Sequence, residues 1–284
     1  MGFLNTISRG WKLSKLSMRV VMKDPELMVY MVLCGVMSLG VLGAMVAPQL
    51  LAMSWAVDAN GQFTGEYYAW TFLGYMLLSI FVTFWNCAIV ANSNIRLQGG
   101  DPKFIDGVKI AASHLPKIFL WGIIAGTIGL LLKMLEGLTR TSDHPSMQIL
   151  GFIVHLIGSL VWWFMTFFIL PVLILEDKGI GESLNMSKEI FKKTWGENIA
   201  SGLGIGLIAF LLAIPVIGIT AVLIIALGPI GLVVGILLMA LLLAWANAAE
   251  QVAVTALYRY AKDGKMPSLY RGMGMSVYNF DAKL

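Results

Sequence analysis

Long stretches without any charged residue are the feature that most restricts how this sequence can fold. Five of them exceed a dozen residues, namely 27–57, 67–95, 118–132, 144–175 and 198–249. A helix crosses the hydrocarbon core of a membrane in about 20 residues. Charged residues make up 13% of the chain, whereas globular proteins carry about 25%. The sequence therefore predicts a polytopic membrane protein and excludes a soluble enzyme, a disordered chain and a coiled coil.

The predicted fold is all-α, a bundle of six transmembrane helices. The stretch 198–249 is long enough for two crossings, and Gly228-Pro229-Ile230-Gly231 is the expected turn between them. Pro215 is the competing break, which we interpret as a kink. The stretch 118–132 reaches crossing length if Lys133 and Glu136 extend to the headgroups. The predicted helices span about 26–57, 66–95, 116–138, 147–175, 198–227 and 229–258. Residues 1–266 would form one transmembrane domain, and residues 267–284 a cytoplasmic tail.

The basic residues support this count of helices. With six crossings, 18 of the 20 Lys and Arg residues fall on one side of the membrane, and only Lys133 and Arg140 fall on the other. Lys and Arg concentrate in cytoplasmic loops. We therefore expect both termini to be cytoplasmic. The net charge of +4 reflects this bias and does not indicate nucleic-acid binding.

Three short basic segments, 3–23, 102–115 and 180–195, each precede a pair of predicted transmembrane helices. In the first, Phe3, Ile7, Trp11, Met18 and Met22 recur at helical spacing on one side. Such segments are typical of amphipathic helices in the headgroup plane, and their order suggests a three-fold repeat of one interfacial and two transmembrane helices. A simpler interpretation is that they cover the ends of the bundle. The residues expected to contact anionic headgroups are Arg9, Lys12, Arg19, Lys23, Lys103, Lys109, Lys188, Lys192 and Lys193.

A few polar residues lie inside the predicted helices. Glu250 is the clearest, and Asn247 and Gln251 share its helix face because residues three or four apart are neighbours. Asn86 lies at a comparable depth in the second helix, with Ser93 seven residues later on the same face. We expect these five residues to form an intramembrane polar cluster. It either joins helices by hydrogen bonds or lines a wet vestibule for an ion, a proton or a lipid headgroup.

Signatures of catalysis and of metal binding are scarce. His114, His144 and His155 share no ligand spacing, and the sequence contains no H-E-x-x-H, C-x-x-C or Walker motif. Cys34 and Cys87 lie in apolar runs, where cysteine usually acts as a small apolar residue. We therefore predict no catalytic residue, no metal and no cofactor. Two small-xxx-small pairs, Gly122 with Gly126 and Gly231 with Gly235, predict close helix packing.

Several local strings together resemble an uncharacterised family of prokaryotic integral-membrane proteins, a domain of unknown function. They are Phe84-Trp85-Asn86, Gly100-Asp101-Pro102, Asp106-Gly107, Pro171, Thr194-Trp195-Gly196-Glu197-Asn198 and Ala256-Leu257-Tyr258-Arg259-Tyr260. The resemblance spans residues 5–265 and extends loosely to the membrane domain of glycerophosphodiester phosphodiesterases. It implies a six-helix protein of the prokaryotic plasma membrane and supplies no activity or site.

These observations favour a non-enzymatic membrane protein, an accessory or organising subunit that binds lipid and partner proteins through its basic cytoplasmic face. The protein partner is expected either in a membrane complex or as further copies of the chain in a homo-oligomer. The tail would contribute to partner binding, since Tyr270, Tyr278 and Phe280 stand in polar surroundings and such a segment frays unless docked. The alternative is a small-solute or ion transporter that uses Glu250. A third interpretation, a lipid-acting membrane enzyme, rests only on the looser similarity.

Overall fold

The computed structural model describes residues 3–51, 64–140 and 145–272, and every regular element in these ranges is an α-helix. The short helices are α1 (Phe3–Lys23), α4 (Phe104–Ser113), α7 (Ile169–Leu175) and α10 (Ser268–Gly272). The long helices are α2 (Glu26–Leu51), α3 (Gly65–Leu97), α5 (Leu115–Arg140), α6 (Pro145–Thr166), α8 (Ile180–Leu227) and α9 (Pro229–Asp263).

Six segments of the described residues are long and apolar enough to cross a membrane. They are Glu26–Ala47, Gly65–Leu97, Leu115–Leu135, Ser146–Leu175, Gly204–Leu227 and Pro229–Asp263. The prediction of an all-α fold with six transmembrane helices is confirmed. Residues 52–57 of the first predicted helix lie outside the described residues.

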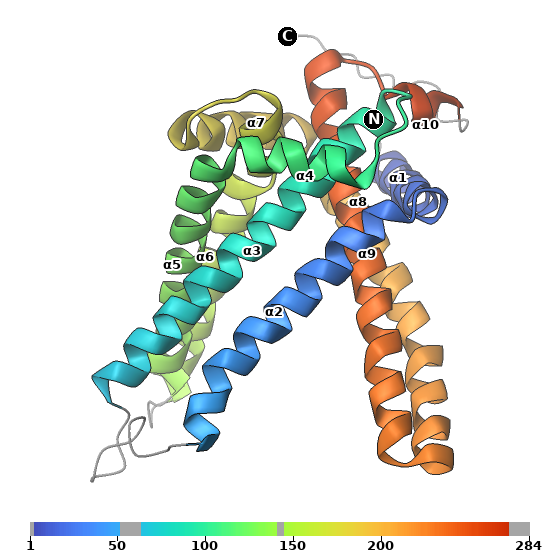
Figure 1. Cartoon of the computed structure of the whole chain (residues 1–284). Helices are drawn as coiled ribbons and strands as arrows, with labels where there is room; N and C mark the ends of the chain where they lie inside the picture. Colours follow the sequence, from blue (N-terminus) through green and yellow to red (C-terminus); the bar gives the residue numbers. More distant parts are fainter. Residues whose placement is uncertain (1–2, 52–63, 141–144, 273–284) are drawn as a thin grey trace.

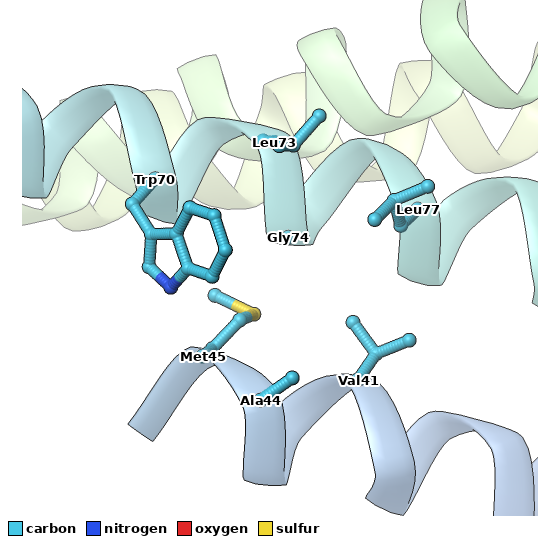
Figure 2. A pocket seen from close by; sticks show the side chains of 7 residues that line it. All are labelled: Val41, Ala44, Met45, Trp70, Leu73, Gly74 and Leu77. Atoms are coloured by element: carbon cyan, nitrogen blue, oxygen red, sulfur yellow. The ribbon is translucent and has the colours of Figure 1, made fainter. Parts of the chain in front are cut away.

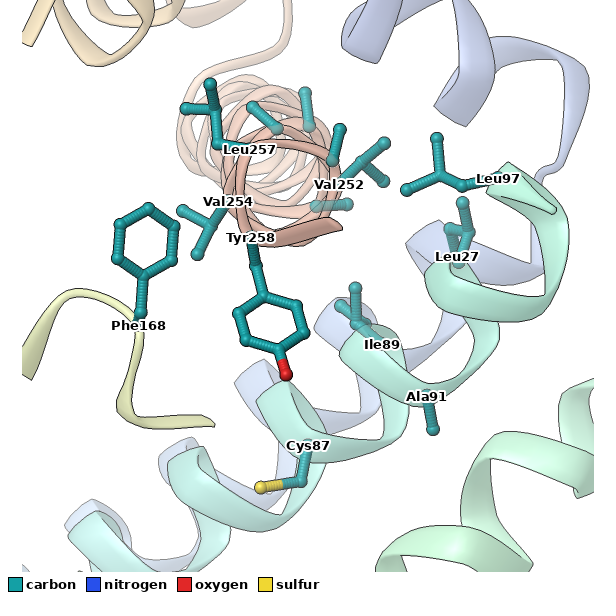
Figure 3. Packing of buried hydrophobic residues seen from close by; sticks show 14 of the residues in the cluster. Leu27, Cys87, Ile89, Ala91, Leu97, Phe168, Val252, Val254, Leu257 and Tyr258 are labelled. Atoms are coloured by element: carbon teal, nitrogen blue, oxygen red, sulfur yellow. The ribbon is translucent and has the colours of Figure 1, made fainter. Parts of the chain in front are cut away.

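The four short helices gather at one end of the molecule, which we call the basic end (Figure 1). From there α3, α5 and α6 run together, whereas α8 and α9 leave as a separate hairpin. The core lies at the basic end, where Leu27, Ile89, Phe168, Leu257 and Tyr258 are fully or almost fully buried. Figure 3 shows Tyr258 of α9 pointing toward Cys87 of α3, with its ring between Phe168 and Ile89. The six spans are therefore held together mainly at one end.

Farther from the basic end, α8 and α9 have few protein neighbours apart from each other. The most apolar part of Gly204–Leu227 has no buried residue. Large apolar side chains of α8 and α9 are exposed there, among them Phe210, Ile225, Ile230 and Leu237. We call residues 206–251, the outer part of this hairpin, the hairpin arm. In a bilayer these side chains face lipid, which is as apolar as they are.

Two helix boundaries differ from the prediction. α8 is one helix of 48 residues, so the third basic segment and the fifth transmembrane helix are continuous. Gly196 alone costs a helix only about 1 kcal/mol, and the junction contains no proline. The fourth predicted helix is interrupted instead, because α6 ends at Thr166 and α7 begins at Ile169. Pro171 falls in the first turn of α7, where a missing N–H group is tolerated.

Glycines set the closest helix contacts, as the two small-xxx-small pairs predict. A Cβ atom at Gly122 would lie 2.7 Å from the side chain of Ile80, and one at Gly126 would lie 2.9 Å from Met76. Gly231 and Gly235 similarly face Leu223 and Thr220 across the hairpin. The hairpin turns at Gly228, whose φ of 58° is in the left-handed region. The predicted turn is confirmed, and Pro215 lies within α8.

The short helices dock on the long ones through specific contacts. α1 packs against α8 and α9, and its buried face contains Leu13, Ser14, Ser17 and Val20. Met22, placed on the apolar face by its spacing, is 66% exposed. Ser14 lies against Gly204 of α8. The buried face of α1 is therefore turned toward protein, and the predicted position of the basic segments in a headgroup plane stays a prediction.

The three-fold repeat also stays a prediction. α1 and α4 are separate short helices that precede two long ones, but the corresponding segment of the third unit is part of α8. α1 packs mainly on the third unit rather than on α2, which follows it directly.

Candidate functional site

The five residues of the predicted polar cluster lie on two helices that pack against each other, α3 and α9. Glu250 and Asn247 of α9 are exposed, and Gln251 is half-buried. Asn86 of α3 is half-buried and Ser93 is fully buried. Among the described contacts, no hydrogen bond or ion pair joins Asn86 or Ser93 to the three cluster residues of α9. The structure therefore packs the two helices against each other, but the described contacts do not connect the predicted cluster residues of one helix with those of the other.

The α3 half of the cluster contains polar atoms that remain available for bonding. Asn86 Oδ1 and Ser93 Oγ are buried and have no hydrogen-bond partner within the described part of the chain, and the same holds for Trp245 Nε1 on α9. An unsatisfied buried polar group costs about 1–3 kcal/mol. Such groups usually bind a water molecule or a polar ligand.

The length of α9 locates Glu250 relative to the membrane. α9 has 35 residues, or about 52 Å at the standard rise, which exceeds a hydrocarbon core of about 30 Å. Its C-terminal turns carry Arg259, Lys262 and Asp263, so this is the end that extends beyond the core. A crossing of about 20 residues that begins at Pro229 ends just before Glu250. On this count the carboxylate of Glu250 would lie near the boundary of the core, and its position inside the membrane stays a prediction.

The surroundings of α9 change at this depth. Every residue from Val252 to Tyr258 is buried, because α1, α2, α3 and α7 surround the helix there. Val254 and Leu257 share the helix face of Glu250, by the spacing of four and seven residues. One turn deeper the same face is exposed at Glu250 and Asn247. The carboxylate therefore sits where the packed core of the basic end gives way to the hairpin arm.

The predicted headgroup contacts are mostly exposed. Lys12, Arg19, Lys23, Lys103, Lys109, Lys192 and Lys193 are exposed, and Lys188 is half-buried. The side chain of Arg9 lies outside the described residues. These side chains come from α1, α4 and the first turns of α8, which all lie at the basic end (Figure 1).

A polar network at the basic end escaped the sequence analysis. Tyr258 and Lys262 both donate hydrogen bonds to Glu176, which follows α7. The Arg259 Nε–H donates to Asn94 Oδ1 of α3 at 2.5 Å. These contacts fasten α9 to its neighbours. The sequence shows only that polar residues border the apolar runs. It does not show which of these distant residues contact each other.

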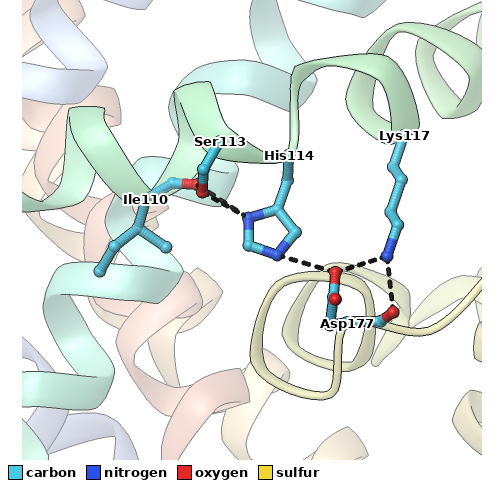
Figure 4. Close-up of polar contacts among 5 residues, drawn as sticks. All are labelled: Ile110, Ser113, His114, Lys117 and Asp177. Carbon is cyan, nitrogen blue, oxygen red and sulfur yellow. Dashed lines mark hydrogen bonds and ion pairs between the residues drawn. The ribbon is translucent and has the colours of Figure 1, made fainter.

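A second part of the network joins α5 to the loop after α7 (Figure 4). Lys117 Nζ lies 2.6 Å from Asp177 Oδ1, and His114 Nε2 lies 3.3 Å from the same atom. His114 Nδ1 is 2.9 Å from the carbonyl oxygen of Ile110. The hydrogen bond from Lys117 is the main reason that the pKa of Asp177 is below its usual value. Asp177 adopts a φ of 52°, which few residues other than glycine do.

The described residues give little support to a catalytic or metal site. They contain no group of three or more His, Cys, Asp or Glu side chains that could hold a metal ion. Cys34 and Cys87 are buried and form no disulfide. His155 Nδ1 lies 3.1 Å from the carbonyl oxygen of Leu132, a contact that serves to pack α6 on α5.

One cavity is almost wholly apolar. It lies between α2 and α3 and has a volume of about 100 Å³ (Figure 2). It is lined by Val41, Ala44, Met45, Trp70, Leu73, Gly74 and Leu77. Ligand sites usually combine apolar walls with a few well-placed polar groups. The indole nitrogen of Trp70 is the one polar side-chain group among its lining residues. We therefore interpret the cavity as a packing gap.

The sequence matches a known family model. The model of a family described as "Family of unknown function (DUF6159)" matches residues 65–268. The match begins at the first residue of α3 and ends at the first residue of α10, so it includes both helices of the polar cluster. No curated protein matches the chain. The looser similarity to glycerophosphodiester phosphodiesterases gains no support from this match.

Proposed function

Because the chain belongs to this family of unknown function, DUF6159, we propose its role from the arrangement of its own residues. It is a multi-pass plasma-membrane protein without enzymatic activity. It acts as an accessory or organising subunit, and its basic end faces the cytoplasm, where it binds anionic lipid headgroups and a partner protein.

The observation that carries this proposal is the set of exposed cations at the basic end. Leu13, Val20 and Val21 of α1 are buried, and α1 packs against α8 and α9. On the same helix the charged residues Lys12, Lys15, Arg19 and Lys23 are exposed. Each Lys or Arg near an anionic membrane surface contributes about 1 kcal/mol to association. A set of this size supports a marked preference for anionic lipid.

The position of Glu250 agrees with this role. A carboxylate at the boundary of the hydrocarbon core lies at the level of the headgroups, where ionisable side chains are far less costly than at the bilayer centre. Together with Asn247 it provides hydrogen-bond acceptors and donors that can contact a headgroup. An enzyme or a pump is not required to explain its presence.

The hairpin arm supports the second part of the proposal, a partner within the membrane. Its exposed apolar side chains surround both helices. Gly206 of α8 has no described atom near its would-be Cβ, so a helix of a partner could approach closely there.

Lipid binding is tested in nanodiscs of defined composition. We expect the purified protein to retain more phosphatidylglycerol than phosphatidylcholine in native mass spectrometry. The triple variant Lys12→Gln, Arg19→Gln and Lys23→Gln should lose most of this preference. Lys133→Gln, an exposed lysine on α5 away from the basic end, is the matched control and should keep it. A protein that extracts gently as a lone monomer with no lipid preference would overturn the proposal.

The second candidate function is transport of a small solute or ion. The observation that favours it is the exposed pair Glu250 and Asn247, across from α3, where Asn86 and Ser93 carry unpaired buried oxygens. If Glu250 couples transport, Glu250→Gln should abolish pH-dependent uptake into proteoliposomes. Uptake that is unchanged in this variant would remove Glu250 from any transport mechanism.

A further inference from the structure

A polar pocket opens at the basic end, where the last turns of α3 and α9 meet the segment before α10. Its volume is about 330 Å³. It is lined by Leu97, Gln98, Arg259, Asp263, Lys265, Met266, Pro267 and Ser268. None of these residues belongs to the basic set of α1, α4 and α8. The pocket is therefore a separate feature of the same end.

The lining combines an apolar floor with charged walls. Leu97 and Met266 are buried and form the floor. Arg259 and Lys265 bring two positive charges, and Asp263 brings one negative charge, so the charged side chains of the lining have a net charge of +1. Gln98 and Lys265 are exposed and can move toward a ligand at the mouth.

Arg259 is held in place before any ligand binds. Its Nε–H donates to Asn94 Oδ1, and its terminal Nη1 lies 3.9 Å from Asp263 Oδ2. The side chain of Arg259 is only 19% exposed. A guanidinium group fixed along one edge presents its remaining N–H groups in a defined direction, which suits a phosphate group.

Two carbonyl groups at the helix ends beside the pocket already accept hydrogen bonds, which reduces their repulsion of an anion. The amide of Gly264 donates to the Tyr260 carbonyl at 2.9 Å. The hydroxyl of Ser268 donates to the Leu97 carbonyl at 3.2 Å. A bonded carbonyl contributes less negative potential at a helix C-terminus, and the lining still carries a net charge of +1.

We propose that this pocket binds a phosphate ester, with Arg259 and Lys265 contacting the phosphate oxygens and Gln98 the ester portion. The phosphate comes either from a lipid headgroup or from a small soluble phosphate ester. The proposal does not depend on the headgroup binding of α1, α4 and α8, since it uses different residues and a saturable site.

Titration calorimetry of the purified full-length protein in a neutral detergent tests the soluble source, with sn-glycerol 3-phosphate as the probe. Native mass spectrometry from nanodiscs that contain phosphatidic acid tests the lipid source. We expect saturable binding of one equivalent in at least one of the two experiments. Saturation by the soluble probe assigns a soluble ester, and saturation by the lipid alone assigns a headgroup.

Lys265→Glu should weaken the saturable binding by about ten-fold or more, because it replaces an attractive charge with a repulsive one. Lys265 is exposed, so this variant should fold normally, which a thermal unfolding curve verifies. Lys133→Glu makes the same charge change away from the basic end and should bind like the unaltered protein. Equal binding by Lys265→Glu and the unaltered protein, or no saturation with either probe, would overturn the proposal. Neither result would bear on the lipid preference that the triple variant of α1 tests.

Discussion

Glu176 shows how a single side chain fastens the hairpin to the rest of the molecule. Burial by itself would raise the pKa of its carboxyl, but the hydrogen bonds from Lys262 and Tyr258 outweigh this effect and lower the pKa below the usual 4.5. A carboxyl with a lower pKa in the folded state stabilises the fold at pH values above its unfolded pKa. That contribution is lost as the pH falls through the folded pKa.

We therefore expect Glu176→Gln to lower the free energy of unfolding at pH 7 by about 1 kcal/mol. The difference between the variant and the unaltered protein should shrink as the pH is lowered from 6 to 3, because the protonated Glu176 also lacks its charge. Unfolding curves in detergent at several pH values measure this. A difference that is constant over the whole range would contradict the role of the Glu176 charge.

The sequence reveals that Glu250 is unusual but does not reveal how deep in the membrane it lies. An acidic residue next to an apolar run of 52 residues is visible without a structure. Its depth is not, because the sequence does not tell where along a 35-residue helix the hydrocarbon core ends. The sequence also did not reveal that Arg259 pairs with Asn94 or Tyr258 with Glu176. The two residues of these pairs are 165 and 82 positions apart.

Among the elements, α4 is positioned by contacts with its N-terminal turn. The hydroxyl of Tyr30 donates to the Phe104 carbonyl at 2.6 Å, and the Asn92 amide donates to the Lys103 carbonyl at 3.3 Å. Gly107 permits this approach, since a Cβ atom there would lie 2.5 Å from the Tyr30 hydroxyl and 2.6 Å from the Ala88 carbonyl oxygen. α4 therefore depends on a glycine at this position.

Gly107→Ala should destabilise the protein by about 1–3 kcal/mol, because the backbone of α3 cannot easily move away from the added methyl group. Gly43→Ala is the matched control. Gly43 is also helical, but a Cβ atom there meets nothing within 4 Å, so its substitution should be neutral or slightly stabilising. Thermal unfolding of both variants in the same detergent decides between these outcomes, and equal stabilities would contradict the packing argument.

α10 is fastened to α1 by one buried contact. Tyr270 is fully buried, and its hydroxyl lies 2.7 Å from Ser17 Oγ. The sequence placed Tyr270 in a polar tail that needs a docking site, and the structure provides that site within the chain itself. Tyr278 and Phe280 lie outside the described residues, so their contribution to partner binding stays a prediction.

Tyr270→Ala should release α10 from α1, and the backbone around the already exposed Lys265 should then open more readily into the active site of a protease. Limited trypsin digestion should then cut near Lys265 several times faster than in the unaltered protein. Tyr270→Phe keeps the apolar ring and loses only the hydroxyl, so its digestion rate should change little. Equal rates for the alanine variant and the unaltered protein would show that α10 is held by other contacts.

The helices themselves were largely predictable, and their ends were less so. The charge-free runs predict six crossings because lipid excludes charge from any helix that spans it. The join within α8 and the gap between α6 and α7 depend on tertiary contacts instead. The Phe168 amide, for example, donates to Ser187 Oγ on α8 at 3.0 Å, a partner that spacing alone does not reveal.

At the scale of the whole molecule, the distribution of basic residues predicts which end of the chain faces the cytoplasm. We expect Lys192→Cys, at the basic end, to react with an impermeant maleimide only after cells are permeabilised. Lys133→Cys should react in intact cells. Both lysines are exposed, and the buried Cys34 and Cys87 are replaced by alanine in the background. The reverse labelling pattern would place the basic end outside the cytoplasm.

Because the hairpin arm is separated from the other spans, a small tilt at its base would produce a large displacement of its tip. The span Gly204–Leu227 contains 24 residues, or about 36 Å of helix. A tilt of about 10° at its packed base therefore displaces its tip by about 6 Å, roughly the length of one helical turn. A small rearrangement among the contacts of Arg259, Tyr258 and Lys262 that tilts the arm would thus move its tip farther than its base.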